Sequence, residues 1–120
     1  MSGPRAVGRI RDRKTFDQLK RPEGRGRQGP LSASYVRSVH GRDGPDLCVA
    51  YAVGRRCGNA VQRNRVRRRL RAAVGAVAPV TRPGCYLLHW REEGSEQEFS
   101  VLKDSVAYVM GRASDPDRIR

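Results

Sequence analysis

Arginine is the residue type that this sequence concentrates densely enough to do chemistry. Six of the ten residues in the segment QRNRVRRRLR (62–71) are arginine, and the stretch from Leu47 to Arg91 holds ten arginines and no Asp or Glu. A guanidinium group stays charged, and its planar fork of donors matches the oxygens of a phosphate and can stack on a base. The chemistry that this pattern indicates is the binding and neutralisation of a polyanion.

The whole chain shares this bias. Its 120 residues include 25 Lys and Arg against 12 Asp and Glu, which gives a formal net charge of +13 at pH 7. A field of that strength makes nucleic acid the default partner. The length allows one domain. We place that domain at residues 12–113, between a basic tail (1–11) that touches phosphate and a polar tail (114–120).

Residues for hydrolysis or metal binding are sparse. His40 and His89 have no evident partner for general acid–base catalysis, and the three cysteines show no metal-binding spacing. An odd number of cysteines without a signal peptide is typical of a reducing cytosol, so we expect a cytoplasmic protein without a cofactor of its own. The apolar runs, such as Leu47–Val53, are too short to span a membrane. Cleavage of a phosphodiester would need a metal supplied from elsewhere.

The elements that must position the arginines follow from periodicity and from turn residues. Helices are expected at 12–21, 60–78 and 99–110, with Asp12 and Asn59 as N-caps and Gly111 as a C-cap. Strands are expected at 32–40, 46–53 and 85–90, the first two joined as a hairpin by the turn at 41–45. This order predicts an α+β fold, with one antiparallel-rich sheet covered by helices.

The helix at 60–78 is expected to have one apolar stripe and a cationic outer surface. The stripe consists of Val66, Leu70, Ala73, Val74 and Val77. Five pairs of arginines lie three or four residues apart with no acid beside them, and on an isolated helix such pairs would cost roughly 1–2.5 kcal/mol in total. A solvated helix face usually alternates its charges, so this one favours a phosphate backbone as partner.

RNA fits this helix better than DNA does. A helix that reads the major groove normally belongs to a helix-turn-helix, a zinc finger or a zipper, and none of these patterns is present. The irregular surface of a folded RNA allows phosphates to be contacted without base readout. Aromatic side chains that stack on bases are the other half of such a pattern. Phe16, Tyr35 and Tyr51 are the candidates, and each is also compatible with a place in the core.

The run from Val53 to Arg71, VGRRCGNAVQRNRVRRRLR, resembles the protein component of bacterial ribonuclease P. The family pattern there is a hydrophobic strand end, two basic residues, Gly-Asn-Ala-Val, and then Arg-Asn-Arg followed by spaced basic residues. A weaker resemblance covers residues 9–111. It implies an α/β sandwich like that of a ribosomal-protein domain, in which three helices cover a small, mostly antiparallel four-stranded sheet. The basic helix would form a left-handed β-α-β crossover, and a short fourth strand would lie within 24–29.

The resemblance also implies a function. In the family, a large RNA subunit removes the 5′ leader of precursor tRNA in a Mg²⁺-dependent hydrolysis, and the Mg²⁺ is held mainly by RNA. The protein is an accessory subunit of this endoribonuclease. It has no catalytic residue, and it binds the RNA subunit and the leader rather than DNA or a membrane.

Site residues carry over by position. Contacts with the catalytic RNA are implied for nine residues: Arg55, Arg56, Asn59, Arg63, Asn64, Arg65, Arg67, Arg68 and Arg71. Phe16 and Tyr35 match positions whose aromatics face the leader in a cleft between the first helix and the central sheet. Lys20 stands where a second aromatic is usual, and a phosphate contact would replace stacking there. The chain also departs from the family at Cys48, where Arg is common, and at Ala52, where Ser is common.

Three other hypotheses remain open at this point. A structural RNA-binding protein of ribosomal type would have the same fold without a substrate, and would not crosslink to a leader through Phe16 or Tyr35. A DNA-binding regulator would bind duplex DNA in a sequence-specific way. A nuclease acting alone would cleave precursor tRNA with Mg²⁺ and no RNA subunit.

Overall fold

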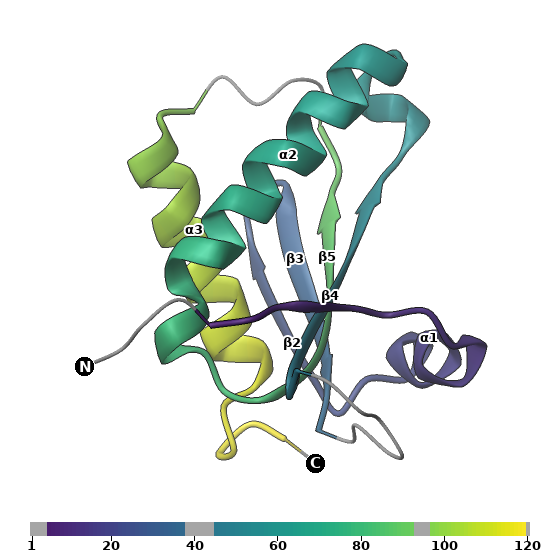
Figure 1. Ribbon diagram of the computed structural model, residues 1–120, viewed down its shortest axis with the longest axis vertical. Helices are drawn as coiled ribbons and strands as arrows, with labels where there is room; N and C mark the ends of the chain where they lie inside the picture. Colours follow the sequence, from purple (N-terminus) through teal and green to yellow (C-terminus); the bar gives the residue numbers. More distant parts are fainter. Residues whose placement is uncertain (1–4, 38–44, 93–96, 120) are drawn as a thin grey trace.

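The computed structural model describes residues 5–37, 45–92 and 97–119. Within these ranges five strands form one sheet in the order β1-β4-β5-β3-β2. The strands are β1 (Gly8–Arg9), β2 (Gly24–Gln28), β3 (Leu31–Val36), β4 (Leu47–Val53) and β5 (Gly84–Trp90). The helices are α1 (Arg13–Lys20), α2 (Ala60–Val77) and α3 (Phe99–Ala113), and the short 3₁₀ turns η1 (Arg55–Cys57) and η2 (Ala78–Val80) flank α2 (Figure 1). The α+β class and the three covering helices are confirmed.

The sheet is mixed, and in this it differs from the expectation. β4 pairs in parallel with β1 and β5, whereas β3 pairs antiparallel with β2 and β5. The predicted hairpin of the strands at 32–40 and 46–53 is wrong, because β5 lies between β3 and β4. Most of β5 is buried, with Tyr86, Leu88 and Trp90 on the face under α2 and α3 and Cys85 on the other face, and this burial suits an inner strand of the sheet. The predicted turn at 41–45 lies mostly outside the described residues, as does His40.

The short strand expected within residues 24–29 is present as β2, and it forms a hairpin with β3. Gln28 faces Leu31 across the ladder, and Gly29 has a φ of +57° in the connecting turn, a conformation that glycine adopts at little cost. On the side facing α3, a Cβ on Gly24 would lie 1.9 Å from the carbonyl oxygen of Ala113. Because Gly24 and Gly26 have no side chain, α3 packs directly on the backbone of β2.

Residues 5–10 are part of the folded body, although the sequence placed them in a basic tail. β1 extends the sheet by pairing with β4, and Ile10 is buried. The guanidinium of Arg5 donates a hydrogen bond to the carbonyl of Ala78 at 2.9 Å and forms an ion pair with Asp46, also at 2.9 Å. This segment therefore ties the end of α2 to the start of β4.

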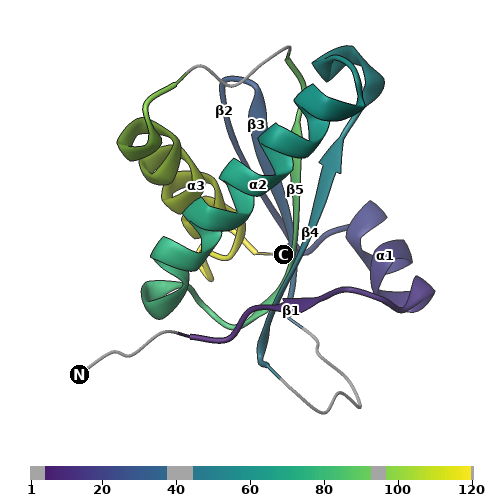
Figure 2. The ribbon, with the colours of Figure 1, turned by 45° about the horizontal axis from the view of Figure 1, so that its top comes forward.

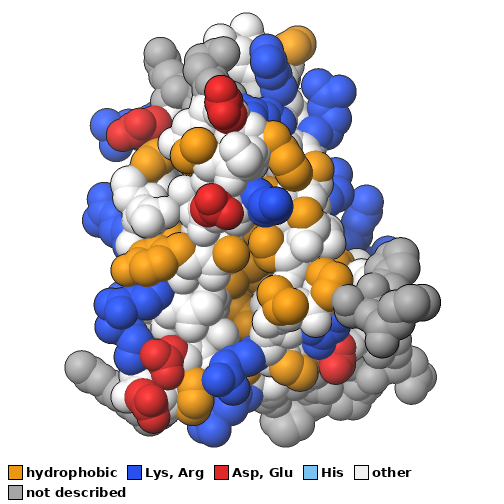
Figure 3. Space-filling view, turned by 90° about the vertical axis from the view of Figure 1, so that its left-hand side faces the viewer, with side chains coloured by type: hydrophobic (Ala, Val, Ile, Leu, Met, Phe, Trp, Pro, Cys, Tyr) orange, Lys and Arg blue, Asp and Glu red, His pale blue; other side chains and the backbone are white. Residues whose placement is uncertain are grey.

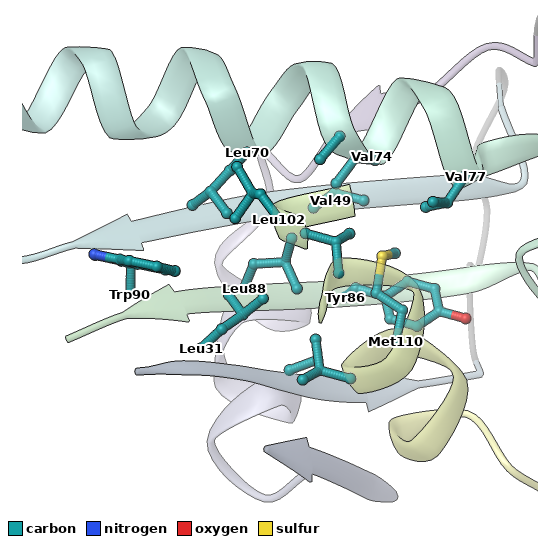
Figure 4. Close-up of a cluster of buried hydrophobic side chains, with 14 of the residues drawn as sticks. Leu31, Val49, Leu70, Val74, Val77, Tyr86, Leu88, Trp90, Leu102 and Met110 are labelled. Atoms are coloured by element: carbon teal, nitrogen blue, oxygen red, sulfur yellow. The ribbon is translucent and has the colours of Figure 1, made fainter. Parts of the chain in front are cut away.

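Two helices cover one face of the sheet and one covers the other (Figures 1 and 2). The larger core lies under α2 and α3, where Leu70 and Val74 of α2 meet Leu88 of β5 and Leu102 of α3 (Figure 4). A smaller core lies under α1. It consists of Ile10, Leu19, Val36, Cys48, Ala50 and Cys85, with Leu87 packed against it.

α2 connects β4 to β5, which are parallel neighbours. In Figure 1 both strands run upward, and in the upper half of the view α2 lies in front of them and β5 lies to the left of β4, so this crossover is left-handed. About 98% of such connections are right-handed. The unusual hand is the one that the resemblance implied.

The helix ends show where local signals suffice. α2 begins at Ala60 behind its predicted N-cap, and its predicted stripe is buried. α3 does not end at Gly111 but continues to Ala113, whose side chain is fully buried. Tertiary packing there outweighs the weak helix preference of glycine. Phe99, the first residue of α3, is 42% exposed.

The end of the chain also contributes to the body. Ser114 is buried, and Ile119 packs against the larger core, although both were assigned to the polar tail at 114–120.

Candidate nucleic-acid interface

The start of α2 is fixed by a reciprocal cap. Oδ1 of Asn59 accepts a hydrogen bond from the backbone N–H of Gln62 at 2.9 Å, and Oε1 of Gln62 accepts one from the N–H of Asn59 at 2.8 Å. Gly58 precedes this cap with a φ of +117°, and a Cβ there would lie 2.1 Å from Oε1 of Gln62. The sequence Gly-Asn-x-x-Gln thus sets the angle between η1 and α2.

The nine residues expected to contact RNA lie together on η1 and along α2. We call them the α2 surface: Arg55, Arg56, Asn59, Arg63, Asn64, Arg65, Arg67, Arg68 and Arg71. Arg63 and Arg67 are half-exposed beside the buried stripe, and the other seven are exposed. The predicted arrangement of a cationic surface on an aliphatic stripe is confirmed.

The positive charge of the α2 surface is not neutralised by carboxylates of the described residues. The ion pairs among the described residues join Arg5 to Asp46, Lys20 to Asp17, and Arg37 to Glu23. None of these six residues belongs to α2. On α2, Arg67 donates to Oδ1 of Asn64 at 2.9 Å, and Nε of Arg63 is buried without a hydrogen-bond partner. The remaining donors of the α2 surface are available to phosphate oxygens.

Two hollows meet at Arg67 and Arg71. The outer one has a volume of about 530 Å³ and lies along the exposed side of α2, lined by Val61, Asn64, Arg67, Arg68 and Arg71. The inner one, of about 490 Å³, lies between β1, the edge of β4 and α2. Four of the five residues of the outer hollow are polar or charged, as a track for a phosphate backbone requires.

The side of the molecule formed by α3 has a different character. In Figure 3 acidic, basic and hydrophobic side chains are intermingled there. Seven of the twelve acidic residues of the chain follow residue 90. The unbroken positive charge is therefore a property of the α2 surface and not of the protein as a whole.

A second surface lies on the opposite side of the sheet, where α1 leaves part of the strands uncovered. Two rows of side chains cross four strands in register: Arg27, Ser32, His89 and Ala52, and then Arg25, Ser34, Leu87 and Ala50. We call these eight residues the open sheet face. Arg25 and Arg27 are exposed, and all the others except Ala50 are half-exposed. This face offers charge and hydrogen bonds, and it carries no Phe, Tyr or Trp side chain.

His89 lies in the row that begins with Arg27, between Ser32 and Ala52. Burial and, to a smaller extent, the neighbouring charge of Arg91 lower the pKa of this imidazole from 6.5. His89 is therefore neutral at pH 7, with one ring nitrogen to donate and one to accept a hydrogen bond. Its neighbour Ser32 accepts a hydrogen bond from Nη1 of Arg91 at 2.6 Å.

Sequence reasoning missed most of the open sheet face. The alternation Gly24-Arg25-Gly26-Arg27 was a usable signal, because a period of two places both arginines on one face of a strand. Nothing local indicates that Ser32, Ser34 and His89 continue the same rows, since their alignment depends on pairing between distant strands.

The structure does not bring Phe16 and Tyr35 together. Phe16 is 38% exposed on α1. Tyr35 is 4% exposed and lies on the other face of the sheet, where its ring centroid is 4.9 Å from that of Tyr86 and its hydroxyl donates to the carbonyl of Pro83 at 2.8 Å. The expectation that Tyr35 lines a leader cleft is wrong, because Ser34 occupies the face of β3 on the α1 side.

The remaining positions singled out from the sequence are also placed. Lys20 is exposed on α1, one turn after Phe16, and its Nζ lies 3.4 Å from a carboxylate oxygen of Asp17. Cys48 and Cys85 are neighbours in the β4–β5 ladder under α1, and both are buried. In the described part of the chain, no three His, Cys, Asp or Glu side chains form a group that would hold a metal ion. None of the helices described is long and apolar enough to cross a membrane.

Comparisons with known proteins agree with one another. The sequence profile of the family Ribonuclease P matches residues 5–114. The ribonuclease P protein component of Symbiobacterium thermophilum is 32% identical over 106 residues, which cover 88% of this chain and 90% of that protein. The component from Brucella suis is 31% identical over 118 residues, covering 89% of this chain and 80% of that protein.

Solved structures show the same fold. The RNase P protein from Thermotoga maritima superimposes with a TM-score of 0.73 at 18% identity, over 87% of this chain and 96% of that one. The RNase P protein from Staphylococcus aureus gives a TM-score of 0.70 at 17% identity, over 88% and 94%. With a profile match over nearly the whole chain and bacterial relatives above 30% identity, this chain belongs to the ribonuclease P protein component family.

Proposed function

We propose that this chain is the protein subunit of a bacterial ribonuclease P, which binds the catalytic RNA through the α2 surface and the 5′ leader of precursor tRNA beside the open sheet face. In this role it assists the RNA-catalysed, Mg²⁺-dependent removal of the leader. The observation that carries the proposal is the uncompensated row of arginines on α2 in a chain of this family.

The α2 surface acts by holding charge in place. Val66, Leu70 and Val74 fix α2 to the sheet and to α3, so the helix that carries the arginines does not have to fold when RNA arrives. Each phosphate that they neutralise releases counterions. The catalytic RNA would thereby be positioned against its substrate at a smaller electrostatic cost.

The leader would lie across the open sheet face. Phe16 has an exposed ring for one base, and Arg25 and Arg27 at the sheet edge would contact phosphates. Ser32, Ser34 and neutral His89 would form hydrogen bonds with base edges. Lys20 would contact a phosphate where relatives have a second aromatic.

The Mg²⁺ ions that the hydrolysis needs are assigned to RNA in this proposal. Mg²⁺ prefers oxygen ligands, above all carboxylates and phosphates. The stretch from Leu47 to Arg91, which forms the α2 surface and its two neighbouring strands, has no carboxylate side chain. The residues of the α2 surface fit the phosphates of an RNA and do not fit a Mg²⁺ ion.

Reconstitution tests the proposal. Precursor tRNA is incubated at low Mg²⁺ with the cognate catalytic RNA, with the protein, and with both. Turnover is expected only with both, and products should carry the mature 5′ end. A protein that binds ribosomal RNA but does not stimulate the reaction would be of the ribosomal type. Cleavage by the protein alone would point to an independent nuclease.

A further inference from the structure

A notch separates the N-terminal strand from α2, and apart from Arg67 and Arg71 at its rim none of its lining has a role in the proposed function. We name it the β1–α2 notch. It is the inner hollow of about 490 Å³, and its walls are Val7–Ile10, Val49–Tyr51 and the α2 residues Arg67, Arg71, Val74 and Gly75. β1 pairs only with Cys48 and Val49, so in the described part of the chain the outer edge of β4 has no strand beside it from Ala50 onward.

The β1–α2 notch combines an aromatic ring, a hydroxyl donor and positive charge. The guanidinium carbon of Arg71 lies 5.4 Å from the centroid of the Tyr51 ring. Burial raises the pKa of Tyr51 to about 12 despite the opposing effect of Arg71, so the phenol stays protonated. A protonated hydroxyl can donate a hydrogen bond to a group that enters the notch.

The notch continues the outer hollow of α2. Arg67 and Arg71 line both hollows, so they form the rim between them. A phosphate backbone that follows the outer hollow therefore reaches the mouth of the notch at Arg67 and Arg71, which would neutralise its phosphate there.

Gly75 leaves space in one wall of the notch, although neither its contacts nor its backbone conformation requires a glycine. It is an exposed residue of α2, where glycine is less stable than alanine. A Cβ placed on it meets no atom within 4 Å, and its φ lies outside the region that favours glycine. No contact in the free protein requires a glycine here, whereas a group entering the notch would use the space.

We propose that the β1–α2 notch binds a single unpaired nucleotide of the catalytic RNA, with its phosphate at Arg67 and Arg71 and its nucleoside beside Tyr51 and Gly75. This proposal rests on the proposed function, since it takes the catalytic RNA as the partner of the α2 surface. The two arginines on the rim favour a phosphate-bearing guest over a peptide strand added to the edge of β4. The volume of about 490 Å³ favours one nucleoside over a base pair.

Filling the notch tests the proposal. Gly75→Leu places a side chain in the space and improves helix preference, so the variant is expected to fold. Ala76→Leu adds the same side chain at the next exposed position of α2, outside the notch. Gly75→Leu should weaken binding of the full-length catalytic RNA about 10-fold, the size of one lost stacking contact. Ala76→Leu should change it by about twofold or less.

Chemical probing of the bound RNA supplies the second readout. Wild-type protein and Ala76→Leu should protect one unpaired nucleotide from 2′-hydroxyl acylation, and Gly75→Leu should leave it reactive. Tyr51→Phe, which removes only the hydroxyl, should weaken binding and keep the fold. Equal affinity and equal protection for Gly75→Leu and wild type would overturn the notch proposal, as would protection of a base-paired segment alone.

The test also separates the two proposals. If wild-type protein fails to bind the catalytic RNA, the proposed function falls, and the notch proposal falls with it. If wild-type protein binds and Gly75→Leu binds equally well, only the notch proposal falls. Binding of an acidic peptide to wild type that Gly75→Leu abolishes, without any effect on RNA, would assign the notch to a protein partner instead.

Discussion

Asn59 and Gln62 each bind the backbone of the other at the first turn of α2, through hydrogen bonds of 2.9 and 2.8 Å. Asn59 was predicted as an RNA contact, yet its side-chain oxygen is already engaged by the helix. The cap holds the turn that presents Arg55 and Arg56. The contribution of Asn59 to RNA binding would therefore come largely through the geometry of its neighbours.

Substitutions at Asn59 separate capping from direct contact. Asn59→Ala removes the cap and should lower the free energy of unfolding by about 1 kcal/mol. Asn59→Asp keeps an acceptor at the helix N-terminus and should keep the stability, but its negative charge should weaken RNA binding. Urea denaturation and RNA titration measure the two effects. An Asn59→Ala variant with full stability and lost RNA affinity would show that the side chain contacts RNA directly.

The salt dependence of RNA binding should report the phosphate contacts of α2. Replacing Arg65 or Arg68 with Ala should reduce the slope of log affinity against log salt by about 0.7–0.9 for each arginine that neutralises one phosphate. Arg112→Ala on α3 removes the same charge away from the α2 surface and is the matched control. If Arg112→Ala reduces the salt slope as much as Arg65→Ala and Arg68→Ala do, RNA binding depends on net charge alone.

Phe16 and Tyr35 should behave in opposite ways. Phe16→Ala should cost about 1–3 kcal/mol of leader binding if the exposed ring stacks on a base, with little loss of stability. Tyr35→Phe removes the buried hydrogen bond to Pro83 and should lower the free energy of unfolding by about 1 kcal/mol, with no change in leader binding. Affinity for precursor tRNA with and without its leader measures the first effect, and urea unfolding measures the second. Reduced leader affinity in a stable Tyr35→Phe variant would contradict the placement of this residue.

The stability of the protein should fall in mild acid because of His89. Its pKa is lowered from 6.5, first by burial and then by Arg91. Below about pH 6.5 the unfolded chain therefore binds a proton more readily than the folded one, and the free energy of unfolding decreases until the pH passes the folded pKa. His89→Gln should lose less stability than wild type between about pH 7.5 and about pH 5.5. Identical losses in urea unfolding at the two pH values would exclude His89 as the cause.

The contact of β2 with α3 should tolerate no side chain at Gly26. A Cβ there would lie 2.3 Å from the carbonyl oxygen of Val109, so Gly26→Ala should lower the free energy of unfolding by about 1–3 kcal/mol. Gly29→Asn is the matched control, because asparagine tolerates a positive φ and a Cβ at Gly29 meets nothing within 4 Å. Chemical denaturation of both variants tests this, and a stable Gly26→Ala would mean that α3 can shift away from β2.

The sequence predicted α2 well because the signals for this helix are local. A cap at Asn59, a stripe with helical spacing and the proline after Ala78 are all read within a few turns. The strand partners were predicted poorly, because pairing joins segments far apart in the chain. The turn residues at 41–45 suggested a hairpin, but β5 lies between the two strands, and its Tyr86, Leu88 and Trp90 complete the core under α2 and α3 from that position.

The error at Tyr35 has a similar origin. In the segment Ser32-Ala33-Ser34-Tyr35-Val36 both alternating sets contain residues that suit a core, so the pattern does not fix which set faces α1. A shift of one residue exchanges the two faces of a strand. The open sheet face could not be assembled from the sequence for the same reason, since it exists only in the register of four strands.

The left-handed crossover affects how long the RNA-binding helix persists in the free protein. α2 is the covalent link between β4 and β5, which pair along their whole length. An element at the margin of a fold can detach in a local opening, whereas α2 is held at both ends by paired strands and along its length by the larger core. The amide protons in the middle of α2 should therefore exchange slowly with deuterium, and the helix that carries the arginines is folded before any RNA arrives.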